Sequence, residues 1–258
     1  RPWLFSVNIF DPHHPFDPPA EYLERYLSQL EEIPLPNYQP GELDNKPIFQ
    51  KTDHLGAYNS PGLYAFPEMS ERDHRLVRAA YWAMIDQVDA QVGRMLDALE
   101  RTGQLENTIV IFMSDHGEML GDHGMYLKGP HFYEPAGHVP LIVSWPEKLR
   151  AARRSRAMVE LVDLAPTLLD AVGLERYAGM QGRSLWPILS APGDLDTHRE
   201  DVYSEYYNAN YRHEPHAYAT MVRTEQYKLV AVHGMDAGEL YDLRQDPTET
   251  HNHWDDAA

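Results

Sequence analysis

The stretch Thr108-Ile-Val-Ile-Phe-Met-Ser-Asp-His-Gly-Glu118 decides the fold class of this chain. It opens with an apolar run rich in β-branched residues, which is typical of a strand buried on both faces. A second apolar run follows at residues 139–145, and helical patterns lie before and after this pair. Strands that alternate with helices predict an α/β fold, with a mostly parallel sheet flanked by helices.

A long helix is predicted immediately upstream. Apolar residues recur at spacings of three and four from Leu76 to Leu99, as on one face of a helix. Ser70 and Asp73 fit a capping box at its start, and Gly103 fits its end.

The first residues predict a further buried strand, because Trp3–Phe10 is apolar on both alternations. A buried strand needs neighbours, and the chain opens with Arg1 rather than with Met. We therefore expect the interior of a longer protein whose sheet begins upstream, and a signal peptide would have been lost with that part. Shorter helices are expected over residues 20–32 and 163–173.

The tail of the chain changes character. Short β-prone runs with close turns predict a small antiparallel sheet. These runs cover residues 201–207, 218–224, 227–233 and 239–243. A break in the pattern near residue 195 predicts a boundary. We expect residues 1–195 to form an α/β core and residues 196–258 to form a small antiparallel β subdomain with a C-terminal tail.

Composition excludes several function classes. With 40 acidic against 22 basic side chains, the net charge is −18, which argues against nucleic acid as a partner. The absence of cysteine excludes disulfides, cysteine zinc sites, iron–sulfur clusters and a cysteine nucleophile within these residues. No apolar run approaches the roughly 18 residues of a membrane span. We expect no membrane partner and a soluble protein of bacterial cytoplasmic or periplasmic type, with the compartment and the oligomeric state left open.

A metal site is predicted where the central strand ends. Asp115 and His116 follow the strand directly, and in open α/β sheets ligands bind at the carboxyl ends of strands. Once the chain turns at Gly117, the two side chains can converge on one divalent cation. The alternative, with about even odds, is a polar turn in which Asp115 caps the next element. Glu118 is a candidate to orient His116 from behind.

The second cluster lies in the loop that follows. Lys128 is a compact cation that can pair with an anionic substrate group in an acidic protein. The alternative is an exposed surface lysine, which most lysines are. His131 is a weaker candidate for contact with a substrate.

The third cluster is His13 and His14, in a loop that holds four prolines within residues 11–19. A histidine fixed at the carboxyl end of a strand can act as a general acid or base near neutral pH. A loop histidine that caps its own backbone is an equally weighted alternative. No nucleophile motif accompanies these groups: Gly-x-Ser-x-Gly, a phosphate-binding loop and His-Glu-x-x-His are all absent from the sequence.

Several ordered segments resemble the sulfatases, a family within the alkaline phosphatase superfamily. The segment Ile111-Phe-Met-Ser-Asp-His-Gly-Glu-Met-Leu-Gly-Asp-His-Gly124 is similar to their second metal-binding segment. Further agreement comes from the stretches Phe10-Asp-Pro-His-His-Pro-Phe16, Val162-Asp-Leu-Ala-Pro-Thr-Leu168 and Glu239-Leu-Tyr-Asp-Leu-Arg-Gln-Asp-Pro247. The resemblance covers nearly the whole chain, and it implies an alkaline phosphatase-like fold that is incomplete at the N-terminus.

The resemblance also implies a mechanism. In the family, a formylglycine made from Cys or Ser is hydrated and attacks the sulfur of a sulfate ester, and a divalent cation, commonly Ca²⁺, holds the nucleophile. By position, Asp115 and His116 match the metal pair, although many sulfatases have Asn at the second place. Lys128 matches the lysine that grips the sulfate, and His13 matches the histidine that assists the leaving group. His14 is then a structural residue or part of the substrate wall.

The formylglycine motif, two acidic ligands and a further lysine lie upstream in the family, and none of them is in this sequence. We therefore expect part of a metal-dependent sulfatase that acts on a sulfated small molecule or saccharide, with Ca²⁺ favoured and Mn²⁺ or Mg²⁺ as alternatives. The competing hypotheses are a phosphonate monoester or phosphodiester hydrolase of the same superfamily, and a catalytically inactive scaffold. The chain alone is expected to show no turnover.

Overall fold

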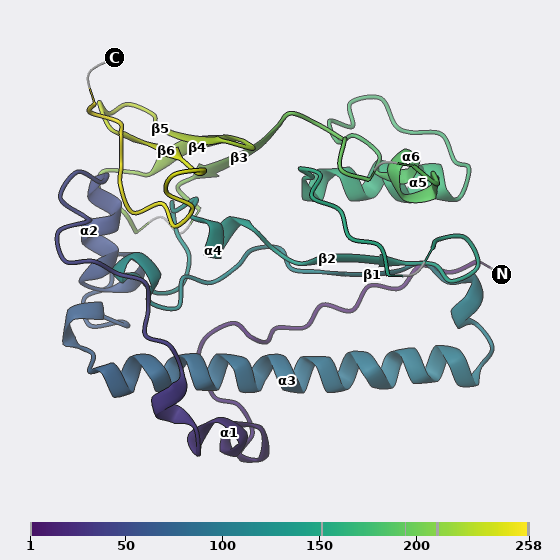
Figure 1. Cartoon of the computed structure of the whole chain (residues 1–258), viewed down its shortest axis with the longest axis horizontal. Coiled ribbons are helices and arrows are strands. Elements are labelled where there is room, and N and C mark those ends of the chain that lie inside the picture. Colours follow the sequence, from purple (N-terminus) through teal and green to yellow (C-terminus); the bar gives the residue numbers. More distant parts are fainter. Residues whose placement is uncertain (1, 151, 194, 210–211, 257–258) are drawn as a thin grey trace.

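The computed structural model describes residues 2–150, 152–193, 195–209 and 212–256. The 31-residue helix α3 (Glu71–Arg101) spans most of the long axis of the molecule (Figure 1). A four-stranded sheet gathers at one end together with helices α2 (Ile48–His54) and α4 (Glu134–Gly137). Helices α5 (Leu164–Ala171) and α6 (Trp186–Ser190) lie at the other end.

The start of α3 confirms the predicted capping box. The Ser70 side chain accepts a hydrogen bond from the backbone N–H of Asp73, and the Asp73 carboxylate accepts from the backbone N–H of Ser70 at 2.9 Å. Gly103 follows the helix with a φ of +66°, a left-handed conformation that a glycine adopts without strain. The buried residues of α3 stop at Met84, so only its first half contributes to the core in the described residues.

The two central strands contradict the prediction of a mostly parallel sheet. Strands β1 (Val110–Met113) and β2 (Leu141–Ser144) form where strands were expected, but they pair antiparallel, with Val110 opposite Ser144. A parallel pair needs a long crossover, usually a helix packed on the sheet. The segment between these strands, residues 114–140, holds only the four-residue α4 and a 3₁₀ turn and no longer helix that could pack on the sheet, and the two strands run antiparallel.

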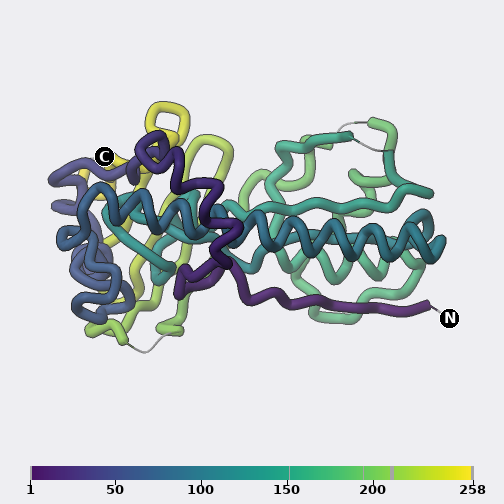
Figure 2. The backbone as a smooth tube through the Cα atoms, turned by 90° about the horizontal axis from the view of Figure 1, so that it is seen from below, coloured from purple at the N-terminus to yellow at the C-terminus, as the bar shows by residue number. Residues whose placement is uncertain are grey.

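The first residues do not form the predicted buried strand. In the described residues, segment 3–10 has no strand partner and is exposed along its length, with Leu4 at 87%. It runs beside α3 in Figures 1 and 2, and Trp3 donates a hydrogen bond to Gln104 beyond the end of that helix. Apolar alternation favours burial, but a strand also needs hydrogen-bonding neighbours.

The tail sheet confirms the sequence prediction closely. Strands β3 (Asp201–Tyr207), β4 (Tyr218–Thr224), β5 (Tyr227–Val232) and β6 (Gly238–Asp242) form an antiparallel sheet in that order. One face packs on Phe49 of α2 and on Phe132, which join Met221 and Val230 in one apolar cluster. The predicted boundary at residue 195 stays a prediction.

The remaining elements are short. Helix α1 (Ala20–Leu27) ends before the predicted residue 32, and a 3₁₀ turn, η1 (Leu30–Glu32), follows it. Further 3₁₀ turns punctuate the loops: η2 (Ala57–Asn59), η3 (Phe66–Glu68), η4 (Leu105–Asn107), η5 (Asp122–Gly124) and η6 (Leu161–Asp163). No helix among the described residues is long and apolar enough to cross a membrane.

Candidate active site

Two loops that are far apart in the sequence meet at a lysine–histidine pair. Nζ of Lys128 lies 2.5 Å from Nε2 of His13, across a separation of 115 residues. Nδ1 of His13 lies 2.7 Å from the carbonyl oxygen of His14, which can only accept a hydrogen bond. Nδ1 therefore carries a proton, and Nε2 of a neutral His13 accepts the hydrogen bond that Lys128 donates.

Lys128 is a half-buried cation with acidic neighbours. Burial lowers its pKa, and the carboxylates of Glu118 and Asp115 oppose that shift because they stabilise the ammonium. The ammonium also lies 5.8 Å from the ring centre of Tyr58. Lys128 is thus a half-buried charged group that contacts His13 and lies near the ring of Tyr58, rather than a free surface lysine.

Asp115 and His116 have a geometry that fits a shared cation. Nδ1 of His116 bonds the carbonyl oxygen of Gly117 at 2.8 Å, which leaves Nε2 for a metal. Oδ2 of Asp115 lies 3.8 Å from that Nε2. Two ligands of one divalent cation lie about 3–4 Å apart, and Asp115 is exposed, so its carboxylate is accessible. These two residues fit a divalent metal, with the remaining ligands to come from elsewhere.

Gly117 fixes the backbone behind this pair. Its N–H donates to the carbonyl oxygen of Ala136 at 2.8 Å, and a Cβ at Gly117 would lie 1.9 Å from the carbonyl oxygen of Pro135. Only glycine permits so close an approach of the two chains. The suggestion that Glu118 orients His116 is not supported, since the Gly117 carbonyl does so. Burial raises the pKa of Glu118 to about 7, which keeps much of this carboxyl protonated near neutral pH.

His14 stacks on His13 with ring centres 4.1 Å apart, and it lies beside Tyr58 and Tyr64. Burial, followed by the charges of His13 and Lys128, lowers its pKa to about 4. His14 is therefore neutral at neutral pH. It forms a wall behind the His13–Lys128 pair, and its contact with a substrate stays a prediction.

His131 lies behind the site in a buried cluster. Nε2 of His131 and Nε2 of His213 lie 2.8 Å and 2.9 Å from the two carboxylate oxygens of Asp53. The His131 side chain has no exposed surface, so in this arrangement it braces the loop that carries Lys128. The prediction that His131 binds substrate is untested. Burial acts to raise the pKa of Asp53, but the two histidines outweigh it and lower this pKa to about 2.

The turn that presents Lys128 is strained. Leu127, immediately before it, is fully buried with a φ of +65°, and His123 and Leu120 in the same loop also have positive φ values. Such conformations cost about 1–3 kcal/mol each for residues other than glycine, and they gather at functional sites. They add a structural indication of function that does not depend on the sequence motifs.

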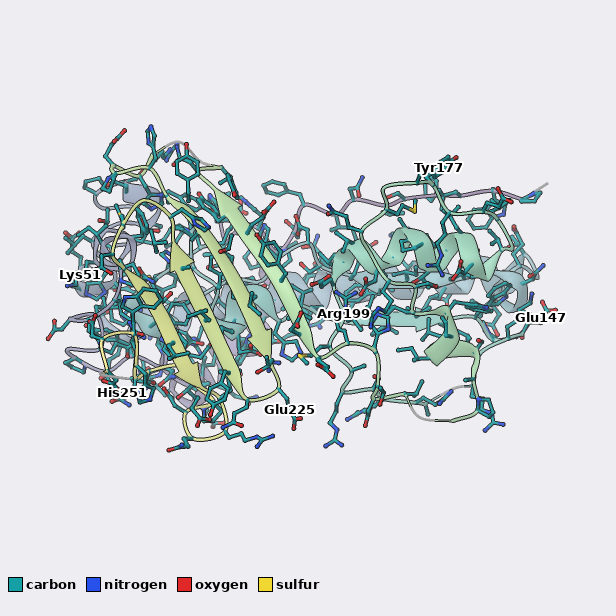
Figure 3. All side chains as sticks on the ribbon, turned by 90° about the horizontal axis from the view of Figure 1, so that it is seen from above. Lys51, Glu147, Tyr177, Arg199, Glu225 and His251 are labelled. Carbon is teal, nitrogen blue, oxygen red and sulfur yellow. The ribbon has the colours of Figure 1, made fainter. Side chains whose placement is uncertain are left out.

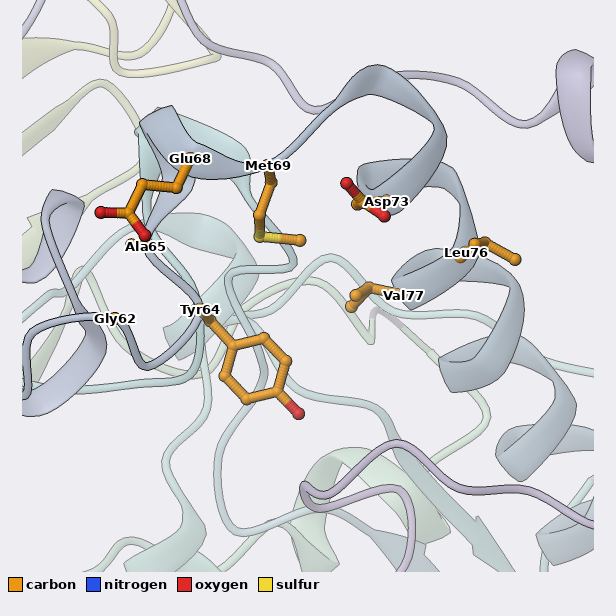
Figure 4. A pocket seen from close by; sticks show the side chains of 8 residues that line it. All are labelled: Gly62, Tyr64, Ala65, Glu68, Met69, Asp73, Leu76 and Val77. Carbon is orange, nitrogen blue, oxygen red and sulfur yellow. The ribbon is translucent and has the colours of Figure 1, made fainter.

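A separate pocket lies near these aromatic walls. Residues of segment 62–69 and of the first turns of α3 line it, among them Tyr64, Glu68 and Val77 (Figure 4). None of its lining residues is Lys128, His13 or a member of the Asp115–His116 pair. The chemistry-bearing groups therefore lie outside this pocket.

Sequence reasoning missed Tyr58, Asp53 and His213. Asp53 lies in the short helix α2, Tyr58 in a 3₁₀ turn and His213 in a loop, and their partners are 70 to 160 residues away, so no local pattern could reveal them. The positive φ of Leu127 was equally invisible, because leucine gives no signal for a left-handed conformation.

Two family models match this chain. The sulfatase model matches residues 1–174, and the model for the C-terminal part of N-sulphoglucosamine sulphohydrolase matches residues 121–258. The chain belongs to the sulfatase family. The segments that carry Lys128, His13 and the Asp115–His116 pair all lie within the sulfatase match.

Individual sulfatase relatives agree with this assignment. An N-acetylglucosamine-6-O-sulfatase from Bacteroides thetaiotaomicron is 37% identical over 215 residues, which are 83% of this chain and 38% of that protein. The uncharacterized sulfatase YidJ from Escherichia coli is 33% identical over 259 residues, 99% of this chain and 48% of that protein. The chain thus spans about half the length of the curated relatives it matches, or less.

The fold is shared with solved structures. A phosphonate monoester hydrolase of Agrobacterium radiobacter matches with a TM-score of 0.80 and 30% identity, over 96% of this chain and 51% of that one. The chain therefore shares its mixed α/β architecture with that enzyme over nearly its whole length, although a mostly parallel sheet is not seen in the described residues.

Proposed function

We propose that this chain is part of a metal-dependent sulfatase that hydrolyses sulfate esters. The observation that carries the proposal is the hydrogen bond between Lys128 and His13, in a loop cluster that also holds Asp115 and His116. Hydrolysis of an anionic ester requires a cation, an imidazole that exchanges protons and two metal ligands at one place.

Asp115 and His116 would hold the divalent cation. The accessible carboxylate of Asp115 suits Ca²⁺, whereas the free Nε2 of His116 is the reason to keep Mn²⁺ as the main alternative. When bound, such a cation and a formylglycine supply a Lewis acid and a nucleophile. Mg²⁺ is the third candidate.

Lys128 would bind the sulfate group of the substrate. The chain carries a net charge of −18, so an anionic ester is repelled unless the site itself is positive. The Lys128 ammonium supplies a local positive charge in hydrogen-bond contact with the group that moves a proton.

His13 would exchange a proton with the leaving oxygen. Its Nδ1 is committed to the His14 carbonyl, which fixes the ring, and Nε2 is the atom that faces Lys128. When a sulfate oxygen takes over the Lys128 hydrogen bond, Nε2 would be free to take up a proton and, as an imidazolium N–H, to donate it to the leaving oxygen, which then departs as the alcohol. The neutral His14 beside it adds no competing charge.

For the substrate we propose a sulfated saccharide. The support is the 37% identity to an N-acetylglucosamine-6-O-sulfatase. A phosphonate monoester or phosphodiester substrate is the alternative, supported by the likeness to a phosphonate monoester hydrolase. An inactive scaffold is the third hypothesis, and it requires the Lys128–His13 contact to serve packing alone.

The test uses the full-length protein with formylglycine formed. Initial rates are compared for an aryl sulfate, an aryl phosphonate monoester and an aryl phosphodiester, after metal removal and after return of Ca²⁺, Mn²⁺ or Mg²⁺ one at a time. We expect sulfate release to exceed the other activities and to depend on the returned metal. A preference for the phosphonate would replace the proposal with its alternative, and inertness toward all three would favour the scaffold.

A further inference from the structure

The C-terminal tail brings together three metal-ligating side chains far from the candidate active site in sequence. His251, His253 and Asp256 each offer one ligand atom, and these atoms all lie within 4.8 Å of one another. Nδ1 of His253 lies 2.5 Å from Oδ2 of Asp256, and the two imidazole rings lie 4.5 Å apart at a steep angle of 84°. Figure 3 places His251 at the end of the molecule that carries the tail sheet.

The backbone of these residues is fixed before any ion binds. The N–H of His253 donates to the carbonyl oxygen of Leu240 in β6 at 2.9 Å, and the N–H of His251 donates to the carboxylate of Asp246 at 2.8 Å. Asn252, between the two histidines, is 1% exposed. Its side chain accepts from the N–H of Leu240 and donates to the carbonyl oxygen of Gly238. The two imidazoles therefore flank an anchored residue, so the chain loses less conformational entropy when a metal ion binds.

We propose that His251, His253 and Asp256 bind a transition-metal dication, with Zn²⁺ as the probe that fits best. Two imidazoles and one carboxylate are ligands that Zn²⁺ accepts in a four-coordinate site whose last position holds water. Ligand atoms around Zn²⁺ lie about 3–4 Å apart, so ligand atoms that already lie within 4.8 Å of one another are close to the spacing that the ion needs. A pair of imidazoles does not suit Ca²⁺, which prefers oxygen ligands.

Occupation of this site has a mechanical consequence. Because the unfolded chain does not present the three ligands together, Zn²⁺ stabilises the folded state by mass action. The bound ion would join residues 251, 253 and 256 of the tail to one another, next to the backbone hydrogen bond that anchors this segment to β6. The tail site offers two imidazoles where the Asp115–His116 pair offers one, so Zn²⁺ is favoured more strongly there.

The test is a titration of metal-free full-length protein with Zn²⁺ by calorimetry. Variants His251→Ala and His253→Ala remove a ligand each. Loss of an outer-shell partner alone costs metal affinity by about 10–100-fold, so we expect each variant to weaken the tail site by at least about tenfold. His233→Ala, at an exposed histidine in the turn after β5, serves as the control and retains the site.

A double variant, Asp115→Ala with His116→Ala, separates this site from the candidate active site. The proposal predicts that it keeps the tail binding event, and that Zn²⁺ raises the melting temperature of this variant but not that of His253→Ala. The proposal is overturned if His251→Ala and His253→Ala bind Zn²⁺ as tightly as the unaltered protein, or if only the double variant loses binding.

Discussion

Asp53 shows how a single buried carboxylate organises the loops behind the candidate site. It accepts hydrogen bonds from His131 and His213, and its Oδ1 also accepts the backbone N–H of Asn59 at 2.9 Å. The histidines outweigh burial and lower the pKa of Asp53 to about 2 from a usual 3.8. A lowered pKa means that the folded state favours the charged form, so this contribution to stability is present above about pH 4 and is lost as the pH falls to about 2.

Replacement of Asp53 by Asn therefore tests the buried cluster. The pKa shift corresponds to about 2 kcal/mol of the free energy of unfolding at pH 7. We expect Asp53→Asn to lose about that much at pH 7, and the difference from the unaltered protein to shrink between about pH 4 and pH 2. Urea denaturation at pH 7, 4 and 3 measures it. Asp44→Asn, at an exposed position of the same segment, is the control, and equal losses in the two variants would contradict the assignment.

Gly117 allows a second test at single-residue scale. A methyl group there would meet the Pro135 carbonyl oxygen at 1.9 Å, so Gly117→Ala must push β1 away from α4. We expect a lower melting temperature and weaker metal binding by the Asp115–His116 pair. Gly93→Ala is the matched control, because its Cβ meets nothing within 4 Å and alanine favours the helix. If both alanine variants melted alike, the close approach at Gly117 would be unimportant.

Local sequence patterns pointed to candidate site residues but not to their surroundings, and the roles of these residues stay predictions. Asp115, His116 and Lys128 stand at strand ends and loop positions that patterns can reveal. Their neighbours Tyr58 and Asp53 come from segments without a periodic signal, because tertiary contacts alone bring them near.

Among the elements, α3 was predicted almost to the residue because its signals are local. The capping box, the apolar spacing and the terminal glycine all act within a few residues. Strands β1 and β2 were also located correctly, but their direction depends on the connection between them, and the parallel prediction was wrong. Segment 3–10 does not form the predicted strand, because a strand depends on a hydrogen-bonding neighbour that the local sequence does not reveal.

The Ser70 cap gives a test at this scale. Replacing an N-cap serine by alanine costs about 1 kcal/mol of stability, since the N–H of Asp73 loses its acceptor. We expect Ser70→Ala to lose that amount in denaturation experiments and Ser70→Thr, which keeps the hydroxyl, to lose much less. A threonine variant as unstable as the alanine variant would mean that shape, not the hydrogen bond, matters here.

Across the whole molecule, a buried ionic cluster joins the tail to the loop beyond Lys128. Nζ of Lys228 contacts Oε1 of Glu134 at 2.9 Å and Oε1 of Glu249 at 2.5 Å, and it donates to the carbonyl oxygen of Phe132. Lys46 approaches from segment 34–68 and donates to the hydroxyl of Tyr241. These contacts make the position of the candidate site depend on the tail.

We therefore expect the substitution Lys228→Met to lower the free energy of unfolding strongly. Removing one partner of a buried ion pair costs about 3–5 kcal/mol because a carboxylate is left uncompensated. We expect a large drop in the midpoint of urea unfolding, and partial recovery in the double variant Lys228→Met with Glu249→Gln, which also removes the uncompensated charge. Lys51→Met, at an exposed lysine, should change little. If the double variant did not recover stability, the loss would come from altered packing rather than from the unpaired carboxylate.

The central claim concerns the Lys128–His13 pair, and the most direct measurement is the initial rate of sulfate release from an aryl sulfate by the full-length protein. His13→Ala should lower kcat by about 10²–10⁴-fold, as expected when a general acid–base group is lost. Lys128→Met should lower it by a comparable factor, and Lys51→Met should leave it unchanged. Sulfate release that persists at the unaltered rate in both His13→Ala and Lys128→Met would contradict the account.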